Sequence, residues 1–542
     1  MPGSWLRPEL VLPLPWIVLT YEGWRWANAR RYMGTISKER HFLSSVYLLR
    51  HSVEAWITLV CLGGLLVILT NTISYPFYRD DVLSRFAPNA RLLFESESIP
   101  VTLTGYPLAV QLLYAFAFMA GQGINDHMAG LIVAAFAAAT VLVTFAIGRV
   151  IFTGRAAWLS TILLLSSPLF VDWSTSGYVD VPVGMYHGLT FLFAFLWMEG
   201  GDRRSSVLTG VMAGLALWTK QSALVLILVP VVVSLLRGWP RRNFLSESVN
   251  CSASIAATLL IAGPWYLRTW ILAGPSRVLP APGAYDAQFV DRSLHSLLTF
   301  IGDAGEWGAW FSGAALIGIA IWIGHLLGIR VRGHGPVLSR RLALLLAAFV
   351  LPYHLIWWQN FSYQTRYLLA SAPMYAALAG HGSDWIIQRM TITSRLSRWA
   401  IVVLASGLVF LGSYKRMGAV YHLIMHPFQT DDVKLTRLNP EAWTLVKHIK
   451  ATIEPGSRLY VMDGTLAYWL HEYELSQGYP TYLDDLHGYD YFVTAQAGSS
   501  VYHFHGTTEN EVQHSLGKSG VLPEVYRYNE GISIYQVSKS MP

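Results

Sequence analysis

Long apolar runs separated by short polar loops make up most of the first 415 residues of the chain. The first clear run, VEAWITLVCLGGLLVILTN at 53–71, matches the about 20 residues that a helix needs to cross a bilayer. Later runs are similar in character, and their spacing predicts an α-helical polytopic membrane protein of about eleven spans. These later spans are expected at 128–151, 156–171, 182–198, 205–219, 222–236, 248–269, 306–329, 342–358, 366–381 and 399–414.

One further apolar stretch, GYPLAVQLLYAFAFMAG at 105–121, either crosses the membrane or lies on its surface. Cytoplasmic loops of membrane proteins carry an excess of Lys and Arg. If 105–121 stays on the outer surface, most loop arginines fall in the cytoplasm, whereas a crossing would turn them outward. We therefore predict a surface helix, a cytoplasmic N-terminus and an extracytoplasmic C-terminus. We also expect the membrane to be a bacterial or archaeal plasma membrane. The arginines that set this orientation are Arg149, Arg155, Arg203, Arg204, Arg237, Arg241, Arg242, Arg330, Arg332, Arg340, Arg341, Arg389, Arg395 and Arg398.

The two ends of the chain differ from its apolar middle. Residues 1–52 are rich in Trp and Arg and broken by prolines, which predicts a cytoplasmic-face or interfacial segment without a cleavable signal peptide. Further on, EAWTLVKHIKATIEPGSRLYVMDG indicates a helix, a Pro-Gly turn and a strand, and more strands are expected at 490–496 and 531–539. The chain therefore divides into 1–52, a transmembrane domain at 53–415 and a small extracytoplasmic α/β domain at 416–542.

Composition agrees with a membrane protein. Charged residues make up 13% of the chain and hydrophobic residues 53%, against about 25% charged residues in soluble domains. Cys61 and Cys251 lie in or beside apolar runs, so we expect buried thiols rather than a disulfide or a metal site. The sequence has no P-loop and no dinucleotide-binding fingerprint, which disfavours a nucleotide donor, and we expect no nucleic-acid partner.

The loop at 72–127, which we call the first loop, carries Asp80 and Asp81 side by side just beyond the first span. The other loops predicted on the same side also bring polar residues to this edge of the membrane. A carboxylate there can accept a proton from an attacking hydroxyl, and Lys or Arg can hold a phosphate leaving group. These loop residues are Asp172, Asp180, Lys220, Gln221, Tyr266, Arg268, Gln364, Arg366 and Tyr367.

Each of these residues also has a plainer interpretation. Either member of the Asp80–Asp81 pair could cap the helix that follows. Asp180 could be an ordinary turn residue, and Lys220 could extend to the membrane surface without a ligand. Asp172 is more easily understood as structural, and Arg268, in an aromatic cluster, as an interface anchor.

The order of several segments resembles the glycosyltransferase C superfamily over 53–415. The segments are YRDD, GYPLAVQLLY, YVDVPVGMYHGLTFLFAFL, GLALWTKQSALVLILVP, PWYLRTWILAG and RYLLASAP. They are most similar to the branch that contains dolichyl-phosphate-mannose protein mannosyltransferases and bacterial lipid A aminoarabinose transferases. No single motif is specific, and the likeness rests on their order and spacing.

This resemblance implies transfer of a sugar from a polyprenyl-phosphate-linked donor to a lipid, glycan or protein acceptor, with inversion at the donor carbon. The family's acidic residues map to Asp80 as base, Asp81 as its neighbour and Asp180 in the second loop. The sequence has Asp-Asp where the family commonly has Asp-Glu, so which of the pair is the base stays open. We assign Lys220, Arg268 and Arg366 to the donor phosphate. The expected substrate contacts are Tyr106, Gln221, Tyr266, Gln364 and Tyr367.

Oligosaccharyltransferases related to this family need a divalent metal, whereas users of monosaccharide phosphates generally do not. We therefore expect no cofactor and no metal between Asp80 and Asp180. The alternatives are a transporter or flippase for a lipid-linked saccharide, which would place polar sites near the midplane, and an envelope protein that binds through 440–540. The sequence leaves open the sugar, the acceptor, the lipid length and the oligomeric state.

Overall fold

The computed structural model describes most of the chain beyond the N-terminal segment predicted at 1–52, which lies outside the described residues. The described ranges are 53–241, 244–278, 289–299, 303–327, 339–389, 395–462, 464–477, 486–494, 524–529 and 532–537.

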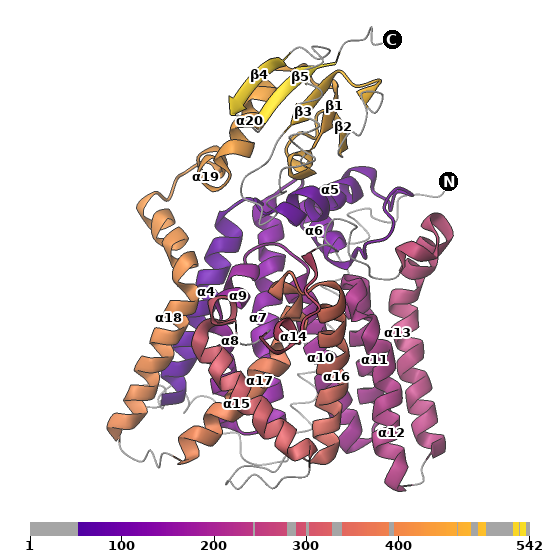
Figure 1. Ribbon diagram of the computed structural model, residues 1–542, viewed down its shortest axis with the longest axis vertical. Helices are drawn as coiled ribbons and strands as arrows, with labels where there is room; N and C mark the ends of the chain where they lie inside the picture. Colours follow the sequence, from indigo (N-terminus) through magenta and orange to yellow (C-terminus); the bar gives the residue numbers. More distant parts are fainter. Residues whose placement is uncertain are drawn as a thin grey trace.

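Helices packed side by side form a bundle, and each overlaps one of the predicted spans (Figure 1). The number of spans stays a prediction. Six described helices are long and apolar enough to cross a membrane, and the helical fold class is confirmed. Short 3₁₀ helices, Gln221–Leu228 and Thr365–Ser371, lead into two of the bundle helices. The bundle consists of α4 (Val53–Ser74), α7 (Asp126–Ile151), α8 (Gly154–Leu165), α10 (Asp180–Gly200), α11 (Arg203–Thr219), α12 (Val229–Arg241), α13 (Phe244–Ala273), α15 (Ala309–Leu326), α16 (Arg340–Asn360), α17 (Ala372–Arg389) and α18 (Arg395–Met425).

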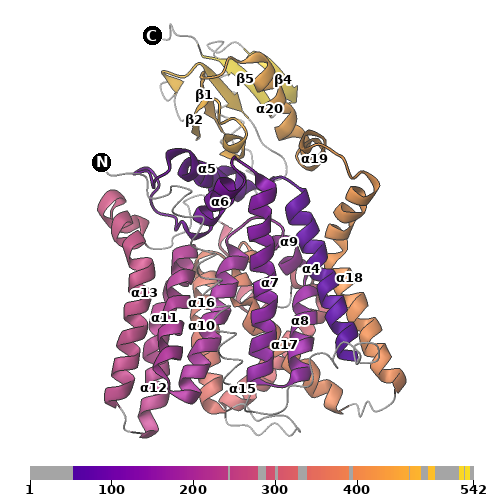
Figure 2. The same ribbon diagram turned by 180° about the vertical axis from the view of Figure 1, so that it is seen from behind.

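The first loop folds into a layer over one end of the bundle. After Asp81 the chain forms a π-helical turn at Val82–Phe86 and then α5 (Ala87–Ser96). The stretch predicted as a surface helix forms α6 (Ala109–Ala120). Both views show α5 and α6 between the bundle and the C-terminal sheet (Figures 1 and 2). We call this end of the molecule the sheet end.

The C-terminal part is a small α/β domain, as predicted. Its sheet has the order β2-β1-β3-β5-β4, with β1 parallel to β2 and β3, and β5 antiparallel to β3 and β4. The strands predicted near 490–496 and 531–539 correspond to β3 and β5, whereas β2 and β4 were not predicted. The elements are α19 (Asp431–Leu438), α20 (Pro440–Thr452), β1 (Arg458–Val461), a 3₁₀ helix (Gly464–Tyr468), β2 (Glu474–Gln477), β3 (Tyr491–Thr494), β4 (Glu524–Asn529) and β5 (Ile532–Gln536).

The boundary predicted at residue 415 needs correction, because it falls inside α18. That helix continues to Met425, and the next helix begins at Asp431. Lys415 and Arg416 end the apolar run, but both are good helix formers and so do not end the helix.

The C-terminal domain is packed onto the first loop rather than tethered at a distance. Phe86 of the π-helical turn shares one buried cluster with Leu445 and Leu466 of the domain. The Tyr468 hydroxyl donates a hydrogen bond to the Asp126 carboxylate, which also accepts one from the Phe77 backbone N–H at 2.9 Å. The domain therefore helps to fix the segment that precedes Asp80 and Asp81.

Close helix contacts in the bundle depend on glycine. A Cβ at Gly210 of α11 would lie 2.0 Å from the backbone oxygen of Ser254 on α13. Small residues of this kind allow helix backbones in membrane proteins to approach closely. By contrast, a Cβ at Gly63 of α4 would meet no atom within 4 Å.

We expect Gly210→Ala to destabilise the protein by about 1–3 kcal/mol, because the added methyl group must push α13 away. Thermal unfolding of the purified protein in detergent measures this as a lower midpoint. Gly63→Ala is the matched control and should be neutral or slightly stabilising. A Gly210→Ala midpoint equal to that of the wild type would contradict the close contact.

Candidate functional site

A cavity of about 620 Å³ lies at the sheet end of the bundle. Its walls come from loops and helices that are far apart in the sequence, and we call it the main cavity. Acidic, basic, tyrosine and apolar side chains all contribute to the lining. The residues used below are Asp81, Arg85, Tyr106, Tyr178, Asp180, Lys220, Gln221, Ser222, Arg277, Tyr353, Ile356, Trp357, Phe361 and Tyr367.

Asp81 faces the main cavity and is held from two directions. Its Oδ2 accepts a hydrogen bond from Nη2 of Arg366 at 2.8 Å, and its backbone N–H donates to the Tyr178 hydroxyl at 2.9 Å. Its side chain makes no capping hydrogen bond to the helical turn that follows. Asp80 is not among the lining residues. Of the acidic pair, the residue that reaches the cavity is therefore Asp81.

Asp180 and Lys220 form a buried ion pair that also lines the main cavity. Asp180 begins α10, where the positive end of the helix dipole favours a carboxylate. Lys220 lies between α11 and the 3₁₀ helix, and its Nζ donates to Oδ1 of Asp180. The two side chains are only 3% and 10% exposed. Lys220 also lies 4.1 Å from the centre of the Tyr367 ring, so it does not extend to the membrane surface.

Arg366 lies behind the main cavity rather than in its lining. Its guanidinium carbon is 4.6 Å from the ring centre of Tyr178, 4.8 Å from that of Trp173 and 5.0 Å from that of Tyr367. Such contacts between a cation and aromatic faces are stronger when they are desolvated. Together with the ion pair to Asp81, they fix this arginine as a partner of the carboxylate. Its predicted role in binding phosphate is not supported by this position.

Three other predicted residues lie outside the main cavity. Arg268 donates to the backbone oxygens of Leu103 and Pro100, and the Tyr266 hydroxyl donates to that of Leu217 at 2.9 Å. The backbone oxygen of Gln364 accepts the Trp357 indole N–H. Arg268, Tyr266 and Gln364 therefore do not line the main cavity, and their predicted roles stay predictions. Backbone carbonyl groups at the end of a helical bundle need hydrogen-bond donors. The side chains of Arg268 and Tyr266 supply them here.

The remaining predicted residues do line the cavity. Tyr106, Gln221 and Tyr367 contribute to its walls. Gln221 uses its amide N–H groups to bind the backbone oxygens of Gly105 at 2.7 Å and Arg277 at 2.8 Å. Gln221 thus joins the two loops that contain Gly105 and Arg277.

Sequence reasoning missed several lining residues, including Arg85, Tyr178 and Tyr353. Arg85 lies one helical turn beyond Asp81, a spacing that places two side chains on one face and could have identified it. Its guanidinium carbon is 5.2 Å from the ring centre of Tyr106. Tyr353 lies within the apolar run of α16, and its hydroxyl is 2.9 Å from that of Ser222. No pattern in the sequence singles it out.

Tyr106 remains a hydrogen-bond donor in this environment. Burial raises its pKa well above the ordinary value, the nearby Asp180 and Asp81 carboxylates raise it further, and Arg85 partly opposes them. A neutral phenol between carboxylates and a cation can donate to an oxygen of a bound molecule.

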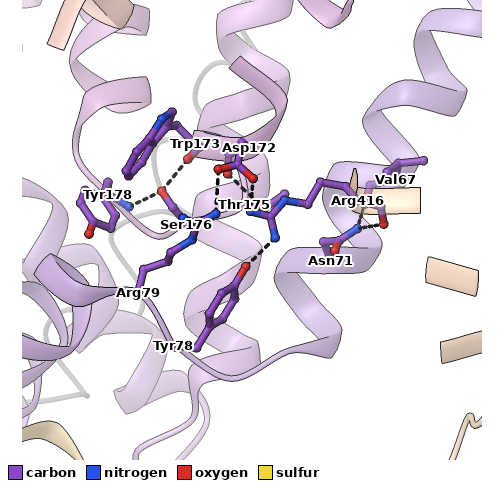
Figure 3. Close-up of polar contacts among 10 residues, drawn as sticks. All are labelled: Val67, Asn71, Tyr78, Arg79, Asp172, Trp173, Thr175, Ser176, Tyr178 and Arg416. Atoms are coloured by element: carbon purple, nitrogen blue, oxygen red, sulfur yellow. Dashed lines mark hydrogen bonds and ion pairs between the residues drawn. The ribbon is translucent and has the colours of Figure 1, made fainter. Parts of the chain in front are cut away.

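A second polar group, the Asp172 cluster, lies near Tyr178, which is one of the residues that line the main cavity (Figure 3). It consists of Asp172 in α9 (Pro168–Trp173), Tyr78 and Arg79 in the first loop, and Arg416 in α18. Asp172 accepts hydrogen bonds from Arg79 at 2.7 Å and from Arg416, which also donates to the Tyr78 hydroxyl. The cluster thus ties the first loop to two helices, in agreement with the structural role expected for Asp172.

The Asp172 cluster also reaches Asp81 through aromatic contacts. The guanidinium carbon of Arg79 is 5.4 Å from the ring centre of Trp173, and the same ring also contacts Arg366, the partner of Asp81. Arg79 directly precedes Asp80 in the chain. Asp172 therefore positions the acidic pair without facing the main cavity itself.

We expect Asp172→Asn to lower the unfolding free energy at pH 7 by about 1–3 kcal/mol, because two guanidinium groups lose their counter-charge. Thermal unfolding measures the loss, and Glu524→Gln, which breaks an exposed ion pair with Arg527, is a near-neutral control. An Asp172→Asn protein as stable as the wild type would contradict a positioning role.

The same cluster predicts a pH dependence. Burial opposes ionisation of Asp172, but Arg416 and Arg79 overcome it and lower the pKa of this carboxyl. The folded pKa thus lies below the unfolded value of about 3.9. The stabilisation is complete above about pH 4 and is lost as the pH falls through the folded pKa. Acid should therefore reduce the stability gap between the wild type and Asp172→Asn, and a gap that widens in acid would contradict this.

The carboxylates of the main cavity do not form a fitting metal site. Asp81 and Asp180 already have Arg366 and Lys220 as cationic partners, which occupy the places where a divalent ion would balance their charge. Within the described ranges, no group of three or more His, Cys, Asp or Glu side chains could hold a metal ion. The expectation of a metal-free site stays a prediction, and no step below uses a metal.

The chain is similar to a known protein family in sequence and to solved membrane proteins in structure. The family model described as dolichyl-phosphate-mannose-protein mannosyltransferase matches residues 106–267. The chain is similar in structure to ArnT from Cupriavidus metallidurans bound to undecaprenyl phosphate, with TM-score 0.60 and 15% identity, covering 90% of this chain and 99% of that one. A comparison with curated protein sequences finds no significant match.

A second similar structure is the archaeal oligosaccharyltransferase AglB from Archaeoglobus fulgidus, in complex with an inhibitory peptide and a dolichol-phosphate. It gives a TM-score of 0.51 at 13% identity and covers 90% of this chain and 75% of that one. The protein is therefore an integral membrane protein with the glycosyltransferase C fold. Its resemblance to the mannosyltransferase and aminoarabinose transferase branch of that superfamily is confirmed.

Proposed function

We propose that the protein is an inverting glycosyltransferase that moves a sugar from a polyprenyl-phosphate-linked donor to an acceptor hydroxyl at the sheet end of the bundle. One observation carries this proposal. Two carboxylate–cation pairs, Asp81 with Arg366 and Asp180 with Lys220, meet at one cavity at the sheet end of the helical bundle. The family match and the ArnT complex with undecaprenyl phosphate support a lipid-linked donor.

In the proposed reaction, Asp81 is the general base. Its carboxylate accepts the proton of the acceptor hydroxyl while the hydroxyl oxygen bonds to the donor anomeric carbon. The bond from that carbon to the phosphate oxygen breaks, and polyprenyl phosphate leaves with the electron pair. Attack from the face opposite the leaving group inverts the anomeric centre. We choose Asp81 over Asp80 because Asp81 faces the cavity.

The leaving phosphate needs positive charge that is held in place before the reaction. Lys220 lines the cavity and is kept in position by Asp180 and the Tyr367 ring. Arg85 lines the cavity with its guanidinium over the Tyr106 ring rather than on a carboxylate in the described part of the chain. We therefore assign the donor phosphate to Arg85 and Lys220, in place of Arg268 and Arg366.

The donor lipid needs an apolar path from the bilayer to the main cavity. Ile356, Trp357 and Phe361 form an apolar part of the cavity wall at the end of α16. Leu351 and Leu355, earlier on the same helix, are 46% and 47% exposed on its outside. This helix thus carries apolar side chains both on its outside and at the cavity, which could contact the first isoprene units with the phosphate at its sheet end.

We expect Asp81→Asn and Asp180→Asn each to lower turnover by about 10²–10⁴-fold. Asp81→Asn removes the general base, and Asp180→Asn removes the carboxylate that holds Lys220 in position. The assay follows release of undecaprenyl phosphate by mass spectrometry, using undecaprenyl-phosphate mannose, glucose, galactose and aminoarabinose as donors and a bacterial envelope extract as the acceptor source. Glu454→Gln, an exposed carboxylate beside β1, is the control. Wild-type turnover in Asp81→Asn would rule out this base.

We expect Arg85→Gln to weaken binding of undecaprenyl phosphate by about tenfold, because a charge-assisted phosphate contact is lost. Native mass spectrometry of the detergent-purified protein measures the affinity. Arg458→Gln removes an exposed arginine on β1 and should leave the affinity unchanged. Equal affinities for Arg85→Gln and wild type would refute this phosphate assignment while leaving the catalytic carboxylates in place.

A further inference from the structure

A second cavity, of about 460 Å³, lies where the C-terminal domain meets α5 and the start of α7. We call it the sheet pocket. Its volume falls within the about 300–1,000 Å³ of small-molecule sites. It shares no lining residue with the main cavity. Two separate parts of the chain therefore build a second concave site at the same end of the molecule.

Aromatic side chains form one wall of the sheet pocket. The rings of Trp443 and Trp469 meet edge to face, with centres 5.4 Å apart, and Tyr468 lies beside them. The Trp443 indole N–H donates to Asp432 at 2.8 Å, which fixes the orientation of the ring without a ligand. Trp443 is half-buried and Trp469 is 7% exposed. A pre-oriented aromatic wall lowers the entropy cost of binding a flat apolar face.

Polar side chains line the rest of the sheet pocket, and their charges are balanced. His127 contacts Asp431 at 2.9 Å, Lys450 contacts Glu472 at 3.1 Å, and Arg91 contacts Glu95 at 2.6 Å. In the sheet pocket both the arginine and the lysine of the lining contact carboxylates, whereas the main cavity also offers Arg85, which lies over the Tyr106 ring. A phosphate in the sheet pocket would therefore have to compete with a carboxylate for each of these two cations. Neutral hydroxyl groups can instead donate to the carboxylates and accept from the cations without displacing either.

These two features together define the chemistry of the ligand. The C–H face of a pyranose ring is weakly positive and packs against the negative face of an aromatic ring, while its hydroxyl groups both donate and accept hydrogen bonds. We propose that the sheet pocket binds a neutral saccharide unit and is separate from the main cavity. This binding does not depend on the proposed transfer reaction.

The position of the sheet pocket connects it to the first loop. Asp126, a lining residue, accepts hydrogen bonds from Tyr468, also a lining residue, and from the Phe77 backbone. A saccharide bound there contacts the groups that join the C-terminal domain to the segment before Asp80. The pocket thus holds a sugar beside the loop that supplies the acidic pair.

The test is binding of simple sugars to the purified full-length protein in detergent, by saturation-transfer NMR and tryptophan fluorescence. The probes are the methyl glycosides of glucose, mannose, galactose and N-acetylglucosamine, with glucuronate and inorganic phosphate as charged comparisons. We expect at least one neutral glycoside to bind with a Kd in roughly the millimolar range. Trp443→Leu should weaken that binding by at least about tenfold.

Controls separate the sheet pocket from the main cavity and from misfolding. Trp270→Leu, on the exposed face of α13, should leave sugar binding unchanged. The Asp81→Asn, Asp180→Asn double variant should also still bind the glycoside. His471→Ala changes an exposed lining residue and gives a second probe if Trp443→Leu unfolds. No glycoside binding, binding unaffected by both pocket variants, or tighter binding of phosphate at this pocket would overturn the proposal.

Discussion

Burial of ionised side chains at the end of an apolar bundle is the constraint on which this structure depends. An isolated charge with so little exposure as Asp180 or Lys220 would be strongly disfavoured, and pairing makes both tolerable. Because the pair joins the start of α10 to the junction after α11, it also fixes the geometry of the cavity wall. Arg366 meets the same requirement through Asp81 and three aromatic rings.

The first loop is held in place from two sides, and each contact bears on the acidic pair. The Asp172 cluster fixes Arg79 against α9 and α18. On the other side, Tyr468 and the Phe77 backbone meet at Asp126. A loop fixed in this way can present Asp81 to a substrate in one geometry, which is what a positioned base requires. The C-terminal domain is thus part of the support of the site.

Most of the fold could be predicted from the sequence, because long apolar runs specify helices and their order. The orientation in the membrane, which rests on the distribution of arginines, stays a prediction. Asp81, Asp180 and Lys220 stood out because the loops that carry them are all predicted on the same side of the membrane. Arg268 and Tyr266 could not be separated from them, since only the folded loops reveal that backbone oxygens take up their hydrogen bonds. Tyr353 could not be predicted as a cavity residue, because a tyrosine within an apolar helix is usually a core residue.

The most direct test of the central claim is a structure of the protein with bound undecaprenyl phosphate. We predict that the phosphate lies in the main cavity, within hydrogen-bond distance of Lys220 and Arg85, with Asp81 facing the position of the attacked carbon and the lipid along α16. A phosphate bound at the opposite end of the bundle, or in the sheet pocket, would contradict the account.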